Sequence, residues 1–198
     1  MMAVEWRVPH ARAASAEDAW FNVLYALIAM ILIASLRPLA MLVPLWLTKT
    51  VGTGWISFAP SFPGWCAAFL ALPFTNDLLV YIYHRAQHAV PVLWRMHELH
   101  HSAGHFDVTV SYRHFWVDPL LQMVFLYPLI GILFKPPASA LLAVLAVNQV
   151  FQYLAHMNSG FSPRRFGLLI THPPYHRIHH SPHQRERFAD RCSMSSST

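Results

Sequence analysis

The sequence predicts an all-α, multi-pass integral membrane helical bundle with about four transmembrane segments and a cytosolic cap rich in histidine. Three observations lead to this prediction. First, 55% of the 198 residues are apolar and only 12% are charged, which is about half the charged share of ordinary soluble domains. Second, four apolar stretches approach the roughly 20 residues that a helix needs to cross a bilayer. Third, the 14 histidines are clustered beside those stretches instead of being spread along the chain.

The first predicted span follows a short polar segment. Residues 1–20 are predicted to be a cytosolic lead-in, because the apolar stretch after them is too long for a secretory signal. That stretch runs from Trp20 to Leu36 and resumes after Arg37-Pro38 as far as Leu47. A proline interrupts helical hydrogen bonding, so we expect one kinked span, or a span followed by an interfacial helix. Residues 49–64, with several glycines and prolines, are predicted to form a loop.

The second predicted span is residues 65–83, in which only Asn76 and Asp77 interrupt the apolar sequence. It leads into residues 84–116, a polar segment that contains two of the histidine clusters. The end of this span is therefore expected to lie next to these histidine clusters.

Two further apolar stretches, residues 119–134 and 138–157, are separated by Lys135-Pro136-Pro137. This pattern predicts a tight transmembrane hairpin. Beyond it the chain is polar and basic, and its low-complexity end, residues 183–198, is predicted to be disordered.

Basic residues beside the spans predict the orientation, because cytoplasmic loops are enriched in Lys and Arg. All but three of the 14 Lys and Arg residues lie in segments 1–20, 84–116 and 158–198. These segments also hold the histidine clusters, so the clusters are expected on the cytosolic side, at the plasma membrane if the protein is bacterial. The basic residues form no long runs, which makes nucleic acid an unexpected partner.

The histidine spacing predicts a metal site. His84 and His88 are four residues apart and project from one face of a helix, where two imidazoles can bind one metal. The segments His97-Glu98-Leu99-His100-His101 and His176-Arg177-Ile178-His179-His180 then repeat one H-x-x-H-H pattern. Eight imidazoles are more than one ion accepts, so two metal ions are implied, and imidazole suits iron, zinc, copper or nickel.

Other polar residues extend these clusters. Asp77 and Tyr81 fall on the helix stripe of His84, where they could orient the ligands. His156 ends the fourth apolar stretch and is either a ninth ligand or an interhelical hydrogen-bond partner. His172 is a possible ligand or a bystander, because Pro173-Pro174 interrupts helical spacing before the last triplet.

The motifs in combination resemble the fatty acid hydroxylase and sterol desaturase superfamily over about residues 70–182. The resemblance rests on Asp77-x-x-x-Tyr81-x-x-His84-Arg85-x-x-His88, Pro91-x-Leu93-Trp94-x-x-His97-x-x-His100-His101-Ser102, Arg113, and Pro173-x-x-His176-x-x-His179-His180-Ser181. It implies a membrane domain over residues 21–182 that uses two non-haem iron ions, O2 and external electrons. The implied reaction hydroxylates or desaturates an unactivated C–H bond of a lipid, such as a sterol or a fatty acyl chain.

The resemblance also implies roles for individual residues. The implied metal ligands are His84, His88, His97, His100, His101, His156, His176, His179 and His180. Asp77 and Tyr81 are expected to support these ligands, and Arg113 is expected to brace the site. Beyond the metal centre no catalytic residue is predicted. Four aromatic residues are candidates for lining a substrate site: Phe115, Trp116, Phe151 and Tyr153.

An electron donor is expected to be a separate protein, because the chain has no dinucleotide, haem-attachment or iron–sulfur motif. A cytochrome b5-like or ferredoxin-like donor would suit a basic cytosolic face. The basic residues expected there are Arg164, Arg165, Arg177, Arg185 and Arg187.

Two alternative functions remain open from the sequence. After the last triplet the chain reaches Asp190 and Arg191-Cys192 and ends at Thr198, so we expect an atypical or truncated tail where the family continues. The first alternative is therefore an inactive metal-binding remnant. The second is a membrane zinc metalloprotease that uses His97-Glu98-x-x-His101 with Glu98 as general base, although this leaves the other histidine clusters unexplained.

Overall fold

A computed structural model describes residues 1, 5, 9–11, 14–163 and 171–181 of the chain. It is largely helical, as the sequence predicts, and its contacts divide it into two compact units. The first unit comprises the described residues within 1–29, 86–115 and 150–198, and the second comprises 30–85 and 116–149. The predicted tail, residues 183–198, lies outside the described residues.

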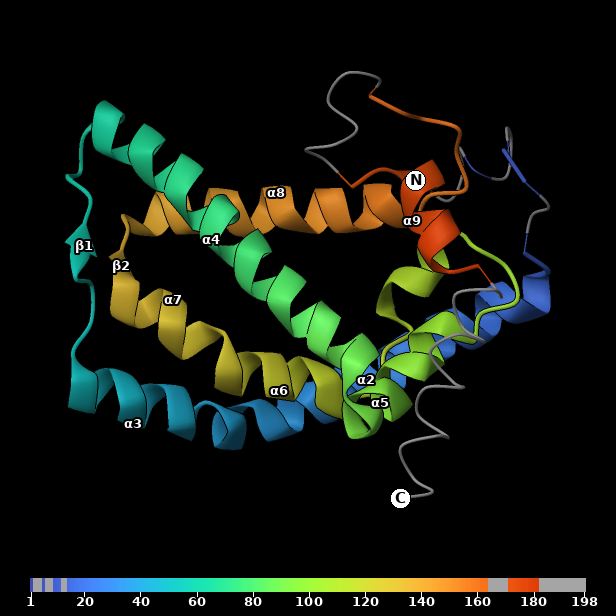
Figure 1. Ribbon diagram of the computed structural model, residues 1–198, viewed down its shortest axis with the longest axis horizontal. Helices are drawn as coiled ribbons and strands as arrows, with labels where there is room; N and C mark the ends of the chain where they lie inside the picture. Colours follow the sequence, from blue (N-terminus) through green and yellow to red (C-terminus); the bar gives the residue numbers. More distant parts are fainter. Residues whose placement is uncertain (2–4, 6–8, 12–13, 164–170, 182–198) are drawn as a thin grey trace. The chain divides into compact units, whose positions relative to one another are not determined.

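Figure 1 labels the elements that the structure describes. The helices are α2 (Ala16–Ala40), α3 (Leu42–Val51), α4 (Phe62–Ala89), α5 (Pro91–His101), the 3₁₀ helix η1 (Val108–Tyr112), α6 (Val117–Phe125), α7 (Tyr127–Leu133), α8 (Ala138–His156) and α9 (Pro173–His179). The strands are β1 (Ile56–Ser57) and β2 (Phe134–Lys135).

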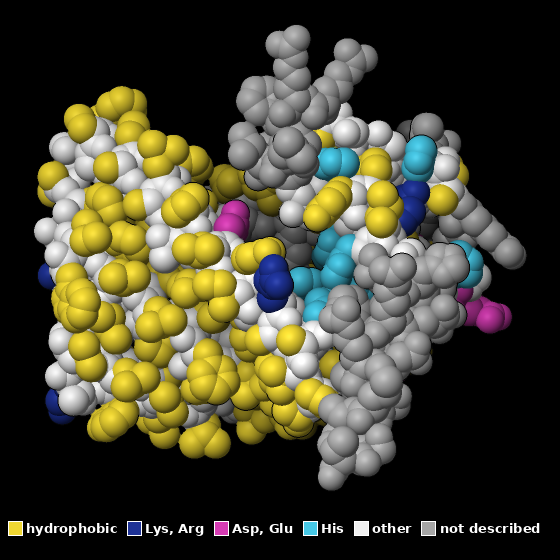
Figure 2. Space-filling model, in the orientation of Figure 1, with side chains coloured by type: hydrophobic (Ala, Val, Ile, Leu, Met, Phe, Trp, Pro, Cys, Tyr) yellow, Lys and Arg dark blue, Asp and Glu magenta, His cyan; other side chains and the backbone are white. Residues whose placement is uncertain are grey.

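Three helical segments are long and apolar enough to cross a membrane: Ala16–Val51, Phe62–Ala89 and Ala138–His156. Many of their large apolar side chains are exposed, as expected of surfaces that contact lipid instead of water. Figure 2 shows such side chains covering much of the visible face. The predicted class, an all-α membrane bundle, is therefore confirmed.

The third predicted span takes a shorter form. Residues 119–134 contribute to α6 and α7, which are separated at Leu126, two residues before Pro128. The apolar segment Val117–Leu133 rises only about 25 Å at 1.5 Å per residue, whereas the hydrocarbon core is about 30 Å thick. Among the residues that the structure describes, three helical segments are thus long enough to span a membrane, and one apolar helix pair is shorter.

The first apolar segment is divided into two helices close to Arg37-Pro38, where the sequence predicts an interruption. Ser15 caps α2: its hydroxyl accepts a hydrogen bond from the Asp18 backbone N–H at 3.0 Å and donates to the Asp18 carboxylate at 2.8 Å. Pro38 lies inside the last turn of α2, which ends at Ala40, and α3 begins two residues later. Because α3 continues to Val51, the predicted loop is shorter than expected and covers residues 52–61.

The second unit has a core of small and medium apolar side chains: Ala68, Leu72, Ala140 and Val144. Larger residues pack around it, and the short strands β1 and β2 pair in parallel with Ile56 opposite Phe134. Gly54 has a φ of +67°, and a Cβ there would lie 2.5 Å from the Cβ of Lys135. Only glycine therefore fits the close approach of this loop to β2.

The helices that carry the histidine triplets begin at prolines. Val90 is extended and Pro91 opens α5, since proline is favoured at the first helical position and disfavours helix before it. Pro173 and Pro174 open α9 in the same way, which leaves His172 outside that helix. This start fixes the position of each triplet on its helix.

Candidate metal centre

Four helices bring nine predicted histidines together. His84 and His88 lie one turn apart on the continuous helix α4, with His84 in the second unit and His88 in the first. The other histidines come from α5, from the last residue of α8, and from α9 and the residue after it. Figure 2 shows histidine side chains gathered in one region of the visible face.

The first group of histidines comprises His84, His88, His97 and His179. One ring nitrogen of each lies within 4.8 Å of the others. The Nε2 atoms of His88 and His179 are 3.1 Å apart. Two ligands that each lie about 2.1 Å from one ion are at most about 4.2 Å apart, so the spacing is close to that of a ligand set.

The second group comprises His100, His156, His176 and His180, again with ring nitrogens within 4.8 Å of one another. The Nε2 atom of His156 lies 3.1 Å from that of His100 and 3.1 Å from that of His176. The His176 and His180 Nε2 atoms are 3.3 Å apart. Four imidazoles from three helical segments therefore converge on one point.

His101 contacts both groups. Its Nε2 is 3.2 Å from the Nε2 of His97 in the first group, and its ring stacks on His180 of the second with centroids 4.2 Å apart. Each H-x-x-H-H triplet is thus divided between the groups, because side chains at i, i+3 and i+4 fan out across one helix face. The repeated motif suits two neighbouring ions better than one.

Burial favours the neutral form of His100 and His180. His97, His100 and His101 are each 2% exposed. Burial, reinforced by the neighbouring histidines, lowers the pKa of His100 and of His180 well below the ordinary 6.5. Neutral imidazole is the form that binds metals.

His156 has a defined tautomer. Its Nδ1 lies 2.8 Å from the backbone carbonyl of Gln152, which can only accept, so Nδ1 carries the proton. The Nε2 lone pair of His156 then faces the other rings of the second group. A backbone carbonyl that fixes a ring in this way is a common support of metal-binding histidines.

Arg113 connects the end of α5 to α2 within the first unit. Its guanidinium donates to the Leu99 carbonyl at 3.3 Å, to the Ser102 hydroxyl at 2.9 Å and to the Asn22 side-chain oxygen at 3.1 Å. It also lies over the ring of Phe21, 5.0 Å from its centroid. These contacts join the end of α5 to α2, and the bracing role of Arg113 stays a prediction.

Some predicted residues do not lie with these groups. Asp77 and Tyr81 are exposed on α4, where the Tyr81 hydroxyl accepts a hydrogen bond from Arg85 at 3.0 Å. The ring of His172 packs near Tyr175, with centroids 6.1 Å apart, and His172 belongs to neither group among the described residues. The supporting role of Asp77 and Tyr81 and the possible ligation by His172 stay predictions.

Sequence reasoning gave His114 little weight as a candidate ligand. Its ring stacks on that of His100, with centroids 4.1 Å apart and planes 14° from parallel, and its backbone carbonyl accepts from the Tyr25 hydroxyl. It stands outside the three clusters and lacks helical spacing to them. The one sequence feature that could have drawn attention to His114 is its position directly after Arg113.

A second missed feature is a buried polar network that joins the N-terminal residues to α9. Asn158 is 2% exposed, and its side-chain oxygen accepts from Arg177 and from the Ala11 backbone. The Glu5 carboxylate accepts from the backbone N–H groups of Val108 and Asn158. Burial of Glu5 raises its pKa above the ordinary value.

Arg177, which was expected on a docking face for the electron donor, takes part in this polar network. Its guanidinium bonds Asn158 and lies 5.6 Å from the centroid of the Phe106 ring, so it contributes to the fold around α9. The other basic residues of the predicted docking face lie outside the described residues: Arg164, Arg165, Arg185 and Arg187.

Comparison with known proteins places the chain in a family. A sequence profile described as fatty acid hydroxylase matches residues 67–195. The chain belongs to the fatty acid hydroxylase family. The matched region contains all nine convergent histidines, and the family assignment agrees with the resemblance found in the sequence.

Individual relatives of this fatty acid hydroxylase family member are named as lipid-modifying enzymes. The chain is 29% identical to human alkylglycerol monooxygenase over 116 residues, which are 59% of this chain and 24% of that protein. It is 33% identical to the ornithine lipid hydroxylase OlsE of Rhizobium tropici over 102 residues, which are 52% of this chain and 30% of that protein. The match therefore spans less than a third of either relative. No solved structure matches the chain.

The geometry and the family both disfavour the metalloprotease alternative. The Nε2 atoms of His97 and His101 are close, but Glu98 is exposed on α5 while those two rings are buried. A single-zinc site with two histidines would also leave the convergence of the four histidines in the second group unexplained.

Proposed function

We propose that this protein is a membrane-bound, O2-dependent lipid oxygenase with two non-haem iron ions, and that it hydroxylates a C–H bond of a lipid. The reaction is R–H + O2 + 2 electrons + 2 H⁺ → R–OH + H2O. The observation that supports it most strongly is the convergence of eight histidines into two groups, with His101 beside both, in a member of the fatty acid hydroxylase family. Hydroxylation is favoured over desaturation because the relatives are named a monooxygenase and a hydroxylase.

The residues present fit two ions. One ion would be held by His84, His88, His97 and His179, the other by His100, His156, His176 and His180, with His101 beside both. The fit is supported by the lowered pKa of His100 and by the tautomer of His156, which directs a lone pair into its group. Iron bound there would supply the binding and reduction of O2 that attack on an inert C–H bond requires.

Aromatic side chains cover part of the histidine rings, of which His84, His176, His179 and His180 remain partly exposed. Phe106 packs against His156, His176 and His180, with centroid distances of 5.7, 5.8 and 5.1 Å. Trp94, 2% exposed, packs against His88 at 5.3 Å. Such shielding limits side reactions of a strong oxidant with solvent.

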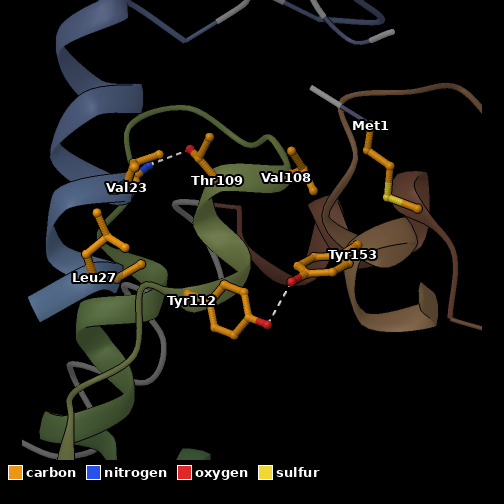
Figure 3. A pocket seen from close by; sticks show the side chains of 9 residues that line it. Met1, Val23, Leu27, Val108, Thr109, Tyr112 and Tyr153 are labelled. Atoms are coloured by element: carbon orange, nitrogen blue, oxygen red, sulfur yellow. Dashed lines mark hydrogen bonds between the residues drawn. The ribbon is translucent and has the colours of Figure 1, made fainter. Parts of the chain in front are cut away.

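A cavity of about 390 Å³ in the first unit is suited to the lipid. Figure 3 shows it between α2, which contributes Val23 and Leu27, and the polar pair Tyr112 and Tyr153, whose hydroxyls are 2.7 Å apart. The cavity shares α8 with the centre, since Tyr153 lies three residues before His156. We assign the apolar wall of α2 to the hydrocarbon chain and the hydroxyls to a polar group of the substrate.

The remaining parts of the proposal concern the membrane and the electron donor. The histidine-bearing segments are placed on the cytosolic side, where basic residues gather in the sequence. Two electrons come from a separate cytochrome b5-like or ferredoxin-like protein. The opposing candidate is a metal-binding remnant without activity, which binds iron but forms no product.

The test is oxygen incorporation from ¹⁸O2 into lipids of cells that express the chain, read by mass spectrometry. We expect a labelled hydroxylated lipid with the wild type and none with His100→Ala. Leu27→Trp, which fills the cavity, should reduce or redirect the product, whereas Leu24→Trp, on the same exposed helix but outside the cavity lining, should not. Iron-loaded wild-type protein that forms no product with any supplied reductase would favour the remnant.

A further inference from the structure

Asn158 lies two residues after the end of α8 and is 2% exposed. Its side-chain oxygen accepts from the Ala11 backbone N–H and from the Arg177 guanidinium, both at 2.9 Å, and its side-chain nitrogen donates to the Ala11 carbonyl at 3.0 Å. Its backbone carbonyl accepts from the His10 N–H at 3.2 Å, and its backbone N–H donates to the Glu5 carboxylate. Each polar group of Asn158 thus has a partner within the first unit.

The two ends of the Asn158 amide have different partners. The oxygen meets two N–H donors, whereas the nitrogen meets a backbone carbonyl, which can only accept, so the hydrogen bonds fix the orientation of the amide. A buried amide without such partners would destabilise the fold. Asn158 therefore joins three parts of the first unit: the described N-terminal residues, the end of α8 and the helix α9.

The helix α9, which carries Arg177, depends on contacts of this kind. It has seven residues, fewer than an isolated helix needs to be stable in water. Pro173 at its start is buried, but Tyr175 and Ile178 are 62% and 65% exposed and contribute little to holding it in place. Besides the histidine rings, the described contact that ties α9 to the end of α8 is the bond from Arg177 to Asn158.

This bond lies close in sequence to ligands of the second histidine group. Asn158 comes two residues after His156, and Arg177 directly follows His176. The Nε2 atoms of those two histidines are 3.1 Å apart, and the Nε2 of His180, three residues after Arg177, is 3.3 Å from that of His176. The bond therefore joins the same two segments that must stay together for the three rings to reach one ion.

We propose that Asn158 is a positioning residue that holds α9, through Arg177, where His176 and His180 can bind a metal ion together with His156. This inference rests on the proposed function, and it adds to that function a residue that touches neither metal nor substrate. Rings that are already held in place lose less conformational freedom when an ion binds, so the ion binds more tightly.

The alternative role is structural: Asn158 would only secure the N-terminal residues to the first unit. Glu5 provides the matched control, because its carboxylate accepts from the backbone N–H groups of Val108 and Asn158. Glu5→Ala removes these two bonds of the same network but keeps the side chains of Asn158 and Arg177. Asn158→Ala and Arg177→Met each remove the bond between the end of α8 and α9.

The first experiment is hydrogen exchange of the detergent-purified full chain without metal, read by mass spectrometry on peptides that contain α9. We expect the backbone amides of α9 to exchange about 10-fold faster in Asn158→Ala, because a hydrogen bond to a charged group is lost. Arg177→Met should have the same effect, and it replaces Asn158→Ala if that variant does not fold. Glu5→Ala should leave the exchange of α9 at the wild-type rate.

The second experiment is anaerobic ferrous loading of the same proteins, with iron affinity measured by competition with a chelator. We expect Asn158→Ala to weaken iron binding by about 10-fold, at the low end of the losses caused by removing groups that support metal ligands. Arg177→Met should cause a similar loss, and Glu5→Ala should keep the wild-type affinity. The double variant Asn158→Ala, Arg177→Met should be no weaker than either single variant, because both act through one bond.

Three results would overturn the positioning role: equal effects of Asn158→Ala and Glu5→Ala, faster exchange of α9 with unchanged iron affinity, or a full further loss of affinity in the double variant. Failure of the wild type to bind two irons would instead overturn the proposed function. Hydrogen exchange would then still show whether Asn158 holds α9, so the two failures are distinguishable.

Discussion

Replacing Arg113 with lysine tests how the histidine segment of α5 is held. Lysine keeps the positive charge but lacks the planar fork that reaches Leu99, Ser102 and Asn22 together. We expect the ammonium to keep one of these three bonds and to lose the contact over Phe21. The first consequence is a less stable first unit.

The size of the effect follows from the bonds lost. Two hydrogen bonds at about 1 kcal/mol each give a loss of about 2 kcal/mol. For a chain of this length that loss lowers the midpoint of thermal unfolding by about 4–8 °C. The assay is thermal unfolding of the apoprotein in detergent, followed by circular dichroism.

Arg95→Lys is the matched control, because Arg95 lies on the same helix but is exposed. Its unfolding midpoint should stay within about 1 °C of the wild type, as for most surface substitutions. Equal midpoints for Arg113→Lys and Arg95→Lys would refute the bracing role of the guanidinium fork.

Two further predictions concern stability. Burial raises the folded-state pKa of Glu5 above its ordinary 4.5. Between pH 4.5 and that raised pKa, the folded protein retains a proton that the unfolded chain has released. The unfolding free energy therefore falls as the pH rises through this range. Glu5→Gln should remove this decline in denaturant titrations at pH 4–7, and an unchanged slope would contradict the burial of the carboxyl. Gly54→Ala should destabilise the protein by about 1–3 kcal/mol because of its positive φ and the nearby Lys135 Cβ. Gly104→Ala, with open space around it and an ordinary φ, should have little effect, and similar losses in both variants would count against the close approach at Gly54.

The features that sequence predicted well depend on local patterns. Span lengths follow from runs of apolar residues, the division of the first apolar segment into α2 and α3 follows from Pro38, and the H-x-x-H-H spacing places three rings on one helix face. The helix stripe also placed Asp77 and Tyr81 with His84. It could not show what that stripe meets, and the structure leaves both residues exposed.

The features that sequence missed depend on contacts between distant residues. Glu5 meets the Asn158 backbone across 153 positions, and Tyr83 meets Asp118 across 35. In the sequence Asp118 resembles any acidic residue in the first turn of a helix, where the helix dipole favours it. No local pattern distinguishes such a residue from one that is buried against another helix.

The central claim, that the two histidine groups form a two-iron centre, is tested most directly by the metal content of protein purified anaerobically, measured by elemental mass spectrometry. We predict about two irons per chain for the wild type, a reduced content for His179→Ala of the first group and His100→Ala of the second, and two irons for His105→Ala, whose ring contacts Asp18 instead. A single zinc that survives His179→Ala, or equal iron in all three variants, would contradict the account.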